Sequence, residues 1–261
     1  MNLDRELRRS SPMAPDAGGE RSSVIPIRPI ALTVLLEGIA LLLLVADLAL
    51  QTIDVRTESN NLVWEQIVRL FDLNSESSIP TWYSVVLLFT ATMITLAIAI
   101  NRHRAGDRFS RHWFLFSLLI LGFSIDESAQ IHDAPSREPL RDILGTGGLL
   151  YYPWVVGAIV GIVVVGFLAY GFFRHLPRRT AGLLIASAAV FISGAIVLET
   201  LSGFYLSRHD EADLTSMTIS SFEEFLELSG AVILIYALLD YGSSQLKEST
   251  ILWNGSDSGS S

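Results

Sequence analysis

Apolar residues occur in six long blocks along the chain, and proline, glycine or charged residues mark the flanks of each block. Each block is close to the length of about 20 residues that a helix needs to cross the hydrocarbon core of a bilayer. The pattern therefore predicts an all-α fold, a polytopic bundle of six transmembrane helices. The blocks lie at residues 30–50, 81–100, 112–133, 151–173, 181–206 and 219–241.

The remaining segments divide the chain into three parts. Residues 1–28 are rich in Ser, Pro, Gly and Arg and have no helical apolar period, which predicts a disordered arm. Residues 29–242 are expected to form the six-helix transmembrane domain. Residues 243–261 end in a Gly/Ser-rich stretch, which predicts a flexible tail.

Two local patterns add detail. Apolar residues between the first two blocks have the spacing of one helix face, which predicts a short amphipathic helix either on the lipid surface or capping the bundle. These residues are Val63, Ile67, Leu70 and Phe71. Gly157 and Gly161 have the spacing of a GxxxG motif, which favours close packing against a neighbouring helix.

Charge and composition exclude several classes of function. The net charge is −9. Because nucleic-acid binding needs a basic surface, this charge argues against a nucleic-acid partner. The chain has no cysteine, which excludes disulfides, iron–sulfur clusters and thiolate zinc sites. The sequence indicates the lipid bilayer as a partner. It does not identify a protein partner.

Basic residues are distributed unevenly between alternate loops. Thirteen of the 18 Lys and Arg residues lie in the N-terminal arm, the 101–111 loop, the 174–180 loop and the C-terminal tail. The positive-inside rule therefore predicts that both termini are cytoplasmic, in a multi-pass protein of the cell (inner) membrane. Segments 51–80, 134–150 and 207–218 are then expected outside.

The predicted spans contain acidic residues and no Lys or Arg. Charged groups inside a bilayer cost several kcal/mol unless they are paired or hydrated, so they mark candidate functional sites. At a rise of about 1.5 Å per residue, Glu127, Glu199 and Glu227 all fall in roughly the outer third of the hydrocarbon core. Pro135 disfavours helical geometry just before it, so the helix is expected to fray near His132 and free its ring to turn.

Several carboxylates cannot all ionise in one dry site, so they share protons or bind a cation. Oxygen-rich ligand sets with one or two histidines suit Zn, Fe or Mn, and one of these divalent metals is therefore the candidate cofactor. The predicted metal ligands are Glu127, His132, Glu199, Glu224 and Glu227. Asp126 or Glu223 is the candidate general base on a metal-bound water.

Three strings in the chain resemble motifs of a group of uncharacterised bacterial multipass membrane proteins. They are Ile79-Pro-Thr-Trp-Tyr-Ser84, Ser124-Ile-Asp-Glu-Ser-Ala-Gln-Ile-His-Asp133 and Glu223-Glu-Phe-Leu-Glu-Leu-Ser-Gly230. The group carries PTW[FY]S, SxDEx4H[DE] and EExxExxG motifs, and the resemblance covers about residues 30–242. It supports the architecture and the choice of residues, and it implies no activity.

Three functions therefore stay open. The first is a membrane-embedded metal site, either with or without catalytic activity on an amphiphilic substrate. The second is a proton- or cation-coupled transporter, which suits acidic relays. The third is a non-catalytic membrane assembly subunit.

Overall fold

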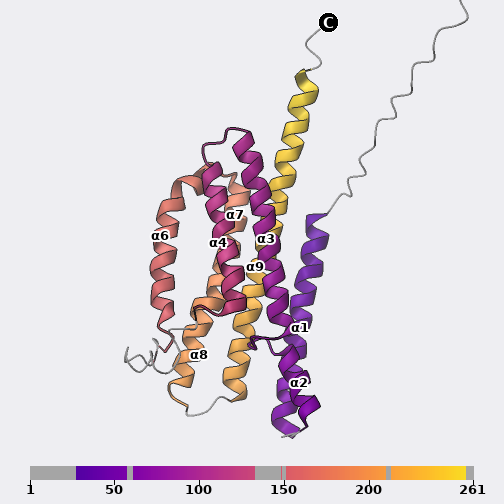
Figure 1. The fold of residues 1–261 in the computed structure, drawn as a ribbon, viewed down its shortest axis with the longest axis vertical. Coiled ribbons are helices and arrows are strands. Elements are labelled where there is room, and N and C mark those ends of the chain that lie inside the picture. The colour runs from indigo at the N-terminus through magenta and orange to yellow at the C-terminus, as the bar shows by residue number, and fades with distance from the viewer. Residues whose placement is uncertain (1–27, 58–60, 133–147, 149–150, 210–212, 257–261) are drawn as a thin grey trace, which may run out of the picture.

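The computed structural model describes residues 28–57, 61–132, 148, 151–209 and 213–256. Within these ranges the chain forms helices and turns and no strand, which confirms the all-α prediction. The long helices run side by side as a bundle (Figure 1). The elements are α1 (Pro29–Thr57), α2 (Leu62–Phe71), α3 (Ile79–Arg104), α4 (Ser110–Ala129), α6 (Trp154–His175), α7 (Arg178–Ile192), the π-helix η3 (Ser193–Leu198), α8 (Glu199–Leu206) and α9 (Leu214–Ser256).

Four helical segments in the described part of the chain are long and apolar enough to cross a membrane, and they indicate a membrane protein. They are α1, α3, α6 and the continuous run Arg178–Leu206. The prediction of six such segments was wrong by this measure. In α4 the acidic pair Asp126 and Glu127 lowers the mean hydropathy of an otherwise apolar helix. Helix α9 carries three glutamates within five positions before its apolar segment. Both helices are nevertheless part of the bundle (Figure 1).

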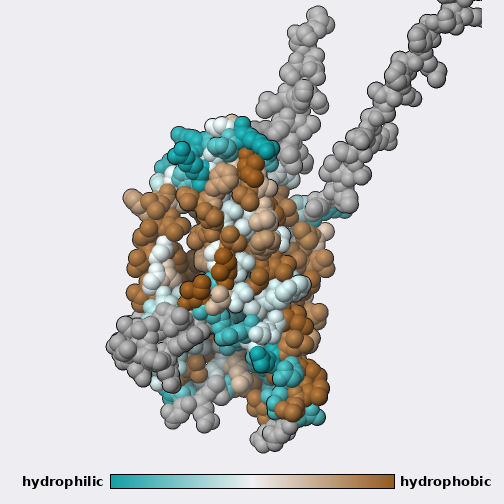
Figure 2. Space-filling model, viewed as in Figure 1, coloured by the Kyte–Doolittle hydropathy of each residue, from teal (hydrophilic) through white to brown (hydrophobic). Residues whose placement is uncertain are grey.

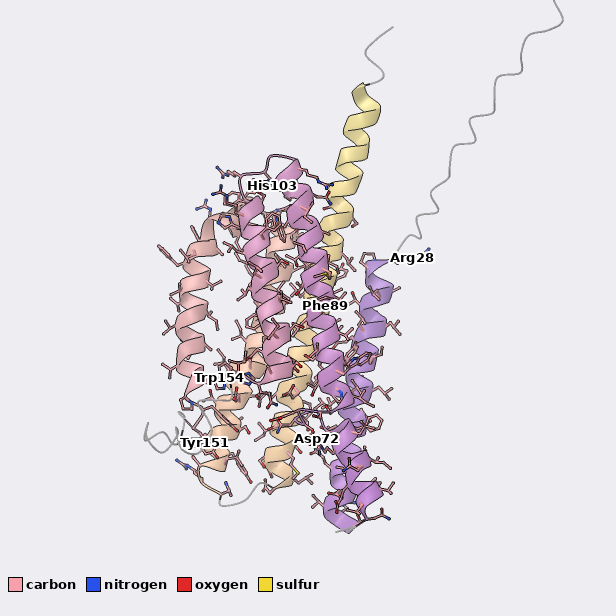
Figure 3. The ribbon with its side chains drawn as sticks, viewed as in Figure 1. Arg28, Asp72, Phe89, His103, Tyr151 and Trp154 are labelled. Atoms are coloured by element: carbon pink, nitrogen blue, oxygen red, sulfur yellow. The ribbon has the colours of Figure 1, made fainter. Side chains whose placement is uncertain are left out.

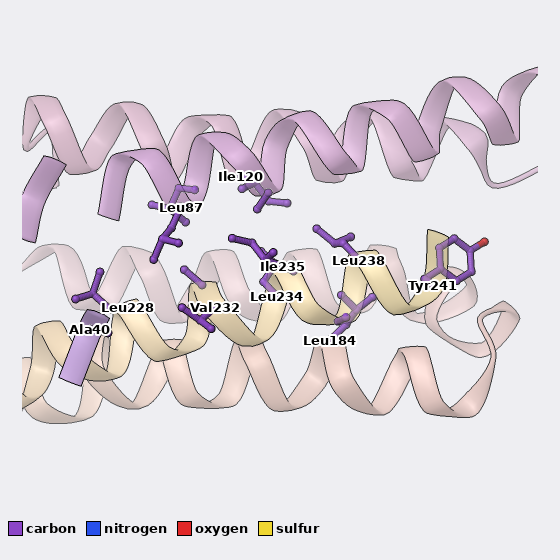
Figure 4. Packing of buried hydrophobic residues seen from close by; sticks show 14 of the residues in the cluster. Ala40, Leu87, Ile120, Leu184, Leu228, Val232, Leu234, Ile235, Leu238 and Tyr241 are labelled. Atoms are coloured by element: carbon purple, nitrogen blue, oxygen red, sulfur yellow. The ribbon is translucent and has the colours of Figure 1, made fainter. Parts of the chain in front are cut away.

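Helix α9 is the central element of the bundle. It packs against α1, α3, α7, η3 and α8, whereas α3 and α4 form the closest pair outside it. From Leu228 to Tyr241 most of its side chains are buried, and they interdigitate with apolar residues such as Leu87 and Leu184 (Figure 4). The helix continues to Ser256, beyond residue 241, where the predicted last span ends, and residue 242, where the predicted domain ends.

Hydroxyl groups connect the helices inside the bundle. Ser117 and Ser124 of α4 donate hydrogen bonds to backbone carbonyls of α3. Ser187 of α7 donates to the carbonyl of Gly230 in α9, and the Tyr83 hydroxyl of α3 donates to a carbonyl of α1. Such bonds hold apolar helices together where burial of apolar surface in lipid provides little driving force.

Polar groups gather at one end of the bundle. Arg102 donates a hydrogen bond to the Tyr241 hydroxyl at 2.7 Å and forms an ion pair with Asp107 at 3.4 Å. His175 lies 3.8 Å from the same Asp107 carboxylate. On the face shown in Figure 2, an apolar surface separates this polar end from the polar opposite end. An apolar band that faces the bilayer, between two ends that face water, would have this distribution of polar and apolar surface.

Two helices leave apolar side chains uncovered. Helix α2 forms where the apolar spacing predicts it, and none of its residues is buried. Helix α6 buries only Val155 and Phe172, whereas Phe167 is 81% exposed. No atom outside the helix's own backbone lies near a Cβ built on Gly157 or Gly161, so these glycines pack against no neighbour in the described chain.

Candidate functional site

The candidate site begins with three glutamates on α9, one turn before its buried apolar segment. Glu223 and Glu227 are four residues apart and Glu224 and Glu227 three apart, so both pairs lie on neighbouring positions of the helix surface. All three side chains are half-buried. The bundle therefore holds these carboxyl groups partly inside its protein interior.

Neighbouring helices bring further carboxylates toward α9. Glu127 of α4, Glu199 of α8 and Glu223 all lie within electrostatic range of both Glu224 and Glu227. The groups with the largest electrostatic effects on Glu224 are all carboxylates. The buried Ser84 hydroxyl of α3 lies within hydrogen-bonding range of Glu127. We call Glu127, Glu199, Glu223, Glu224 and Glu227 the carboxylate cluster.

The π-helix η3 positions Glu199 beside α9. A π-helix inserts an extra residue into the helical turn and changes the direction of the side chains that follow, and such segments are frequent at functional sites. Gly194 in η3 is buried, and a Cβ built on it would lie 2.5 Å from the Glu223 carbonyl oxygen and 3.0 Å from Glu227 Cγ. Glycine at this position therefore allows η3 and α9 to approach at the level of the cluster.

Glu199 is buried and accepts a hydrogen bond from the indole of Trp154 at 2.8 Å. Trp154 is the first residue of α6 and lies at the same end of the bundle as Tyr151 and Asp72, away from His103 (Figure 3). The indole thus connects α6, which has few other buried residues, to the cluster.

His132 lies beyond the end of α4, as the fraying predicted from Pro135 requires. The helix ends at Ala129, and Gln130 adopts a left-handed conformation with φ of 48°. The backbone N–H of His132 donates to Asp126 Oδ1 at 3.0 Å, and its Nδ1 lies 2.6 Å from Asp126 Oδ2. The imidazole also contacts the Trp154 ring, with centroids 4.9 Å apart.

The five predicted metal ligands are therefore brought into one region but do not form a ligand set. Among the described residues, no group of three or more His, Asp or Glu side chains has an arrangement that could hold a metal ion. Pairwise hydrogen bonds account for part of this: Glu199 accepts from Trp154, and His132 bonds Asp126. The described residues therefore do not show the predicted Zn, Fe or Mn ligand set.

The two candidate general bases have different surroundings. Asp126 forms a hydrogen bond with His132, which fixes the orientation of the imidazole. Glu223 belongs to the cluster and lies within electrostatic range of Glu224 and Glu227. Asp133, the neighbouring acidic residue of the same motif, lies outside the described residues.

Three contributors to the site were not expected from the sequence. The sequence pattern indicates no role in the site for Trp154, and Ser84 stands out only as the last residue of the first motif. Gly194 is a small residue within an apolar helix, which is the general signal of close helix packing. Their roles depend on the register between helices, which the spacing along one helix does not specify.

Comparison with known proteins gives one match. No curated protein and no solved structure is significantly similar to the chain. A family model, described as a domain of unknown function (DUF8692), matches residues 36–241. This range contains all four membrane-length helices except the first residues of α1, as well as the whole carboxylate cluster. The chain therefore belongs to the DUF8692 family.

Proposed function

We propose that the protein is a multi-pass protein of the cell membrane whose carboxylate cluster takes up and releases protons, as in a proton-coupled transporter. The observation that carries the proposal is the convergence of five carboxyl groups from α4, α8 and α9. Like charges so close in a low-dielectric interior cannot all remain ionised, so the group titrates as a unit that shares protons.

In this proposal α4 and α9 also cross the membrane, giving six spans with both termini in the cytoplasm. Both are too polar to face lipid along their whole length. The apolar helices α1, α3 and α7 surround α9, so its glutamates can face protein. Ionisable residues within membrane spans are tolerated when they face the bundle interior.

Infrared spectroscopy of the protein in lipid vesicles tests proton binding directly. The C=O stretch of protonated carboxyl groups should titrate with pH in the wild type. Part of this signal should disappear in Glu224→Gln and in Glu227→Gln. Glu65→Gln is the matched control, because Glu65 is exposed on α2. A spectrum that does not titrate, or that is the same in all four proteins, would contradict the proposal.

Transport is tested by a second measurement. A pH jump applied to vesicles on a solid support should displace charge transiently in the wild type and the Glu65→Gln control. The displacement should be lost in Glu227→Gln. A protein whose carboxyl groups titrate but move no charge would be a proton-binding subunit and not a transporter.

A bound transition metal is the second candidate, and the Asp126–His132 pair favours it. Histidines that ligate metals usually donate their other ring N–H to a carboxylate, which is the arrangement of this pair. Glu127 lies within electrostatic range of His132 and would be the neighbouring ligand. Elemental analysis of the purified protein tests this: Zn, Fe or Mn at one equivalent, lost in Glu127→Gln, would replace the proton proposal.

A further inference from the structure

A second polar site lies on α1, where this helix meets α9 and the loop between α2 and α3. Asp47 is 1% exposed and Gln51, one turn later, is 7% exposed. The Gln51 amide donates a hydrogen bond to Asp47 Oδ1. The Ser221 hydroxyl of α9 and the Leu73 backbone amide also lie beside the Asp47 carboxyl group.

Two oxygen atoms of this pair lack a partner. Asp47 Oδ2 and Gln51 Oε1 are both buried, and neither forms a hydrogen bond of good geometry with a described residue, although Ser221 and Leu73 lie within range of the Asp47 carboxyl group. Both atoms are acceptors, so neither can satisfy the other while Asp47 is ionised. A buried acceptor without a partner costs about 1–3 kcal/mol, and more when it is charged. The pair therefore presents two buried oxygen atoms that a single ligand can bind.

The charge around the pair is also uncompensated. The charged group with the largest effect on the Asp47 carboxyl group is Asp72, which is also acidic. Asp72 ends α2 and accepts a hydrogen bond from the Asn74 N–H at 3.0 Å. Burial raises the pKa of Asp72, in agreement with a carboxylate that lacks a favourable counter-charge.

The donor set identifies the ligand class. Two carboxylates and one amide oxygen, with no nitrogen or sulfur, suit a hard cation, and two negative charges suit a divalent one. Ca²⁺ tolerates irregular geometry and takes carboxylate, amide, backbone carbonyl and water oxygens. We propose that Asp47, Gln51 and Asp72 bind a divalent cation of the size of Ca²⁺ between α1 and the loop that joins α2 to α3.

This site goes beyond the proposed proton function and does not depend on it. The main electrostatic partners of Asp47 do not include any member of the carboxylate cluster. A cation here would hold α1 and the loop together at one end of the bundle. Its role would be to stabilise that end from the outer side of the membrane.

Thermal unfolding of the purified protein in detergent, after treatment with a chelator, tests the proposal. The midpoint of the wild type should rise with the logarithm of the added Ca²⁺ concentration, since a ligand that binds the folded state stabilises it. Asp47→Asn should abolish this shift. Gln51→Leu and Asp72→Asn should weaken Ca²⁺ binding by at least about tenfold, measured by calorimetry, as the loss of a ligand requires.

Two variants serve as controls. Glu37→Gln changes another acidic residue of α1, which accepts a hydrogen bond from Ser229, and it should keep the full Ca²⁺ shift. Glu227→Gln should also keep it, which separates this site from the carboxylate cluster. The proposal is wrong if Ca²⁺ does not stabilise the wild type. It is also wrong if Asp47→Asn and Gln51→Leu respond to Ca²⁺ as the wild type does, or if Glu227→Gln alone loses the response.

Discussion

Glu127 is the residue at which the proton and metal interpretations predict opposite effects. If the cluster shares protons, Glu127→Gln should leave the bundle equally stable or more stable, because an amide replaces a neutral acid at little cost. If the cluster binds a metal, the same substitution should lower stability and abolish any effect of a chelator. Thermal unfolding of the wild type and of Glu127→Gln, each with and without chelator, shows whether the substitution raises or lowers stability.

Gly230 is a residue at which any side chain should be costly. A Cβ built there would lie 2.7 Å from Phe191 Cβ and 2.8 Å from its backbone nitrogen, so α7 and α9 would have to separate. Overpacking of this kind costs about 1–3 kcal/mol, and we expect Gly230→Ala to lower the free energy of unfolding by that amount. Gly182→Ala in α7 is the control, because no atom outside its own stretch of the helix backbone lies within 4 Å of its Cβ position. Equal stability of the two variants would contradict the packing described here.

The sequence predicts some residues of the site but not the residues that contact them. Glu199 and Glu227 could be selected because an acidic residue in an apolar helix is costly, and this cost depends on the sequence alone. Their partners could not be selected. The Trp154–Glu199 bond depends on the π-helix that rotates Glu199, and no periodicity in the sequence predicts that rotation.

Asp213 stabilises the start of α9 through its charge. Its carboxylate accepts hydrogen bonds from the Tyr205 hydroxyl at 2.7 Å and from the Ser216 N–H at 3.0 Å. The first of these bonds is the main reason that its pKa lies below the usual 3.8. A lowered pKa stabilises the folded state at pH values above the unfolded pKa, and this contribution is lost as the pH falls through the folded pKa.

We therefore expect Asp213→Ala to increase hydrogen exchange in the first turns of α9 at neutral pH. The difference from the wild type should shrink below about pH 4, where the unfolded carboxylate becomes protonated. Asp213→Asn, which lacks the charge but keeps an acceptor, should lie between the two. A difference that is independent of pH would show that the charge plays no part.

The sequence predicts that the amphipathic helix α2 lies either on the lipid surface or against the end of the bundle as a cap. Leu62 and Val63 are 77% and 68% exposed, and no residue of α2 is buried, which favours the lipid surface. Because the chain has no cysteine, a spin label can be attached to a single introduced one. A label at Val63→Cys should be more accessible to oxygen in a bilayer than one at Glu65→Cys on the opposite face. Equal accessibility would exclude membrane contact.

At the scale of elements, helices were easier to predict than their ends or their environment. Length and apolar content predict a helix in each of the six blocks, and the structure places one there. Counting apolar residues could not show that α4 and α9 differ from the other spans. That difference depends on which side of each helix the neighbours cover, and one sequence does not contain this information.

The orientation of the whole molecule remains a prediction that the distribution of basic residues supports. We expect Ala105→Cys, exposed between α3 and α4, to react with a membrane-impermeant reagent only after the cells are opened. Ser77→Cys, exposed in the loop before α3, should react in intact cells. The reverse pattern would place the carboxylate cluster on the cytoplasmic side and overturn the positive-inside argument.

The central position of α9 has a consequence for biosynthesis. Chains fold progressively from the N-terminus as the ribosome elongates them, but here the helix that contacts most of the others is made after all of its partners. The earlier helices must enter the bilayer before their shared packing surface exists. A nascent chain stopped before Leu214 would therefore expose glycine and serine surfaces to lipid, and would be a substrate for membrane quality control.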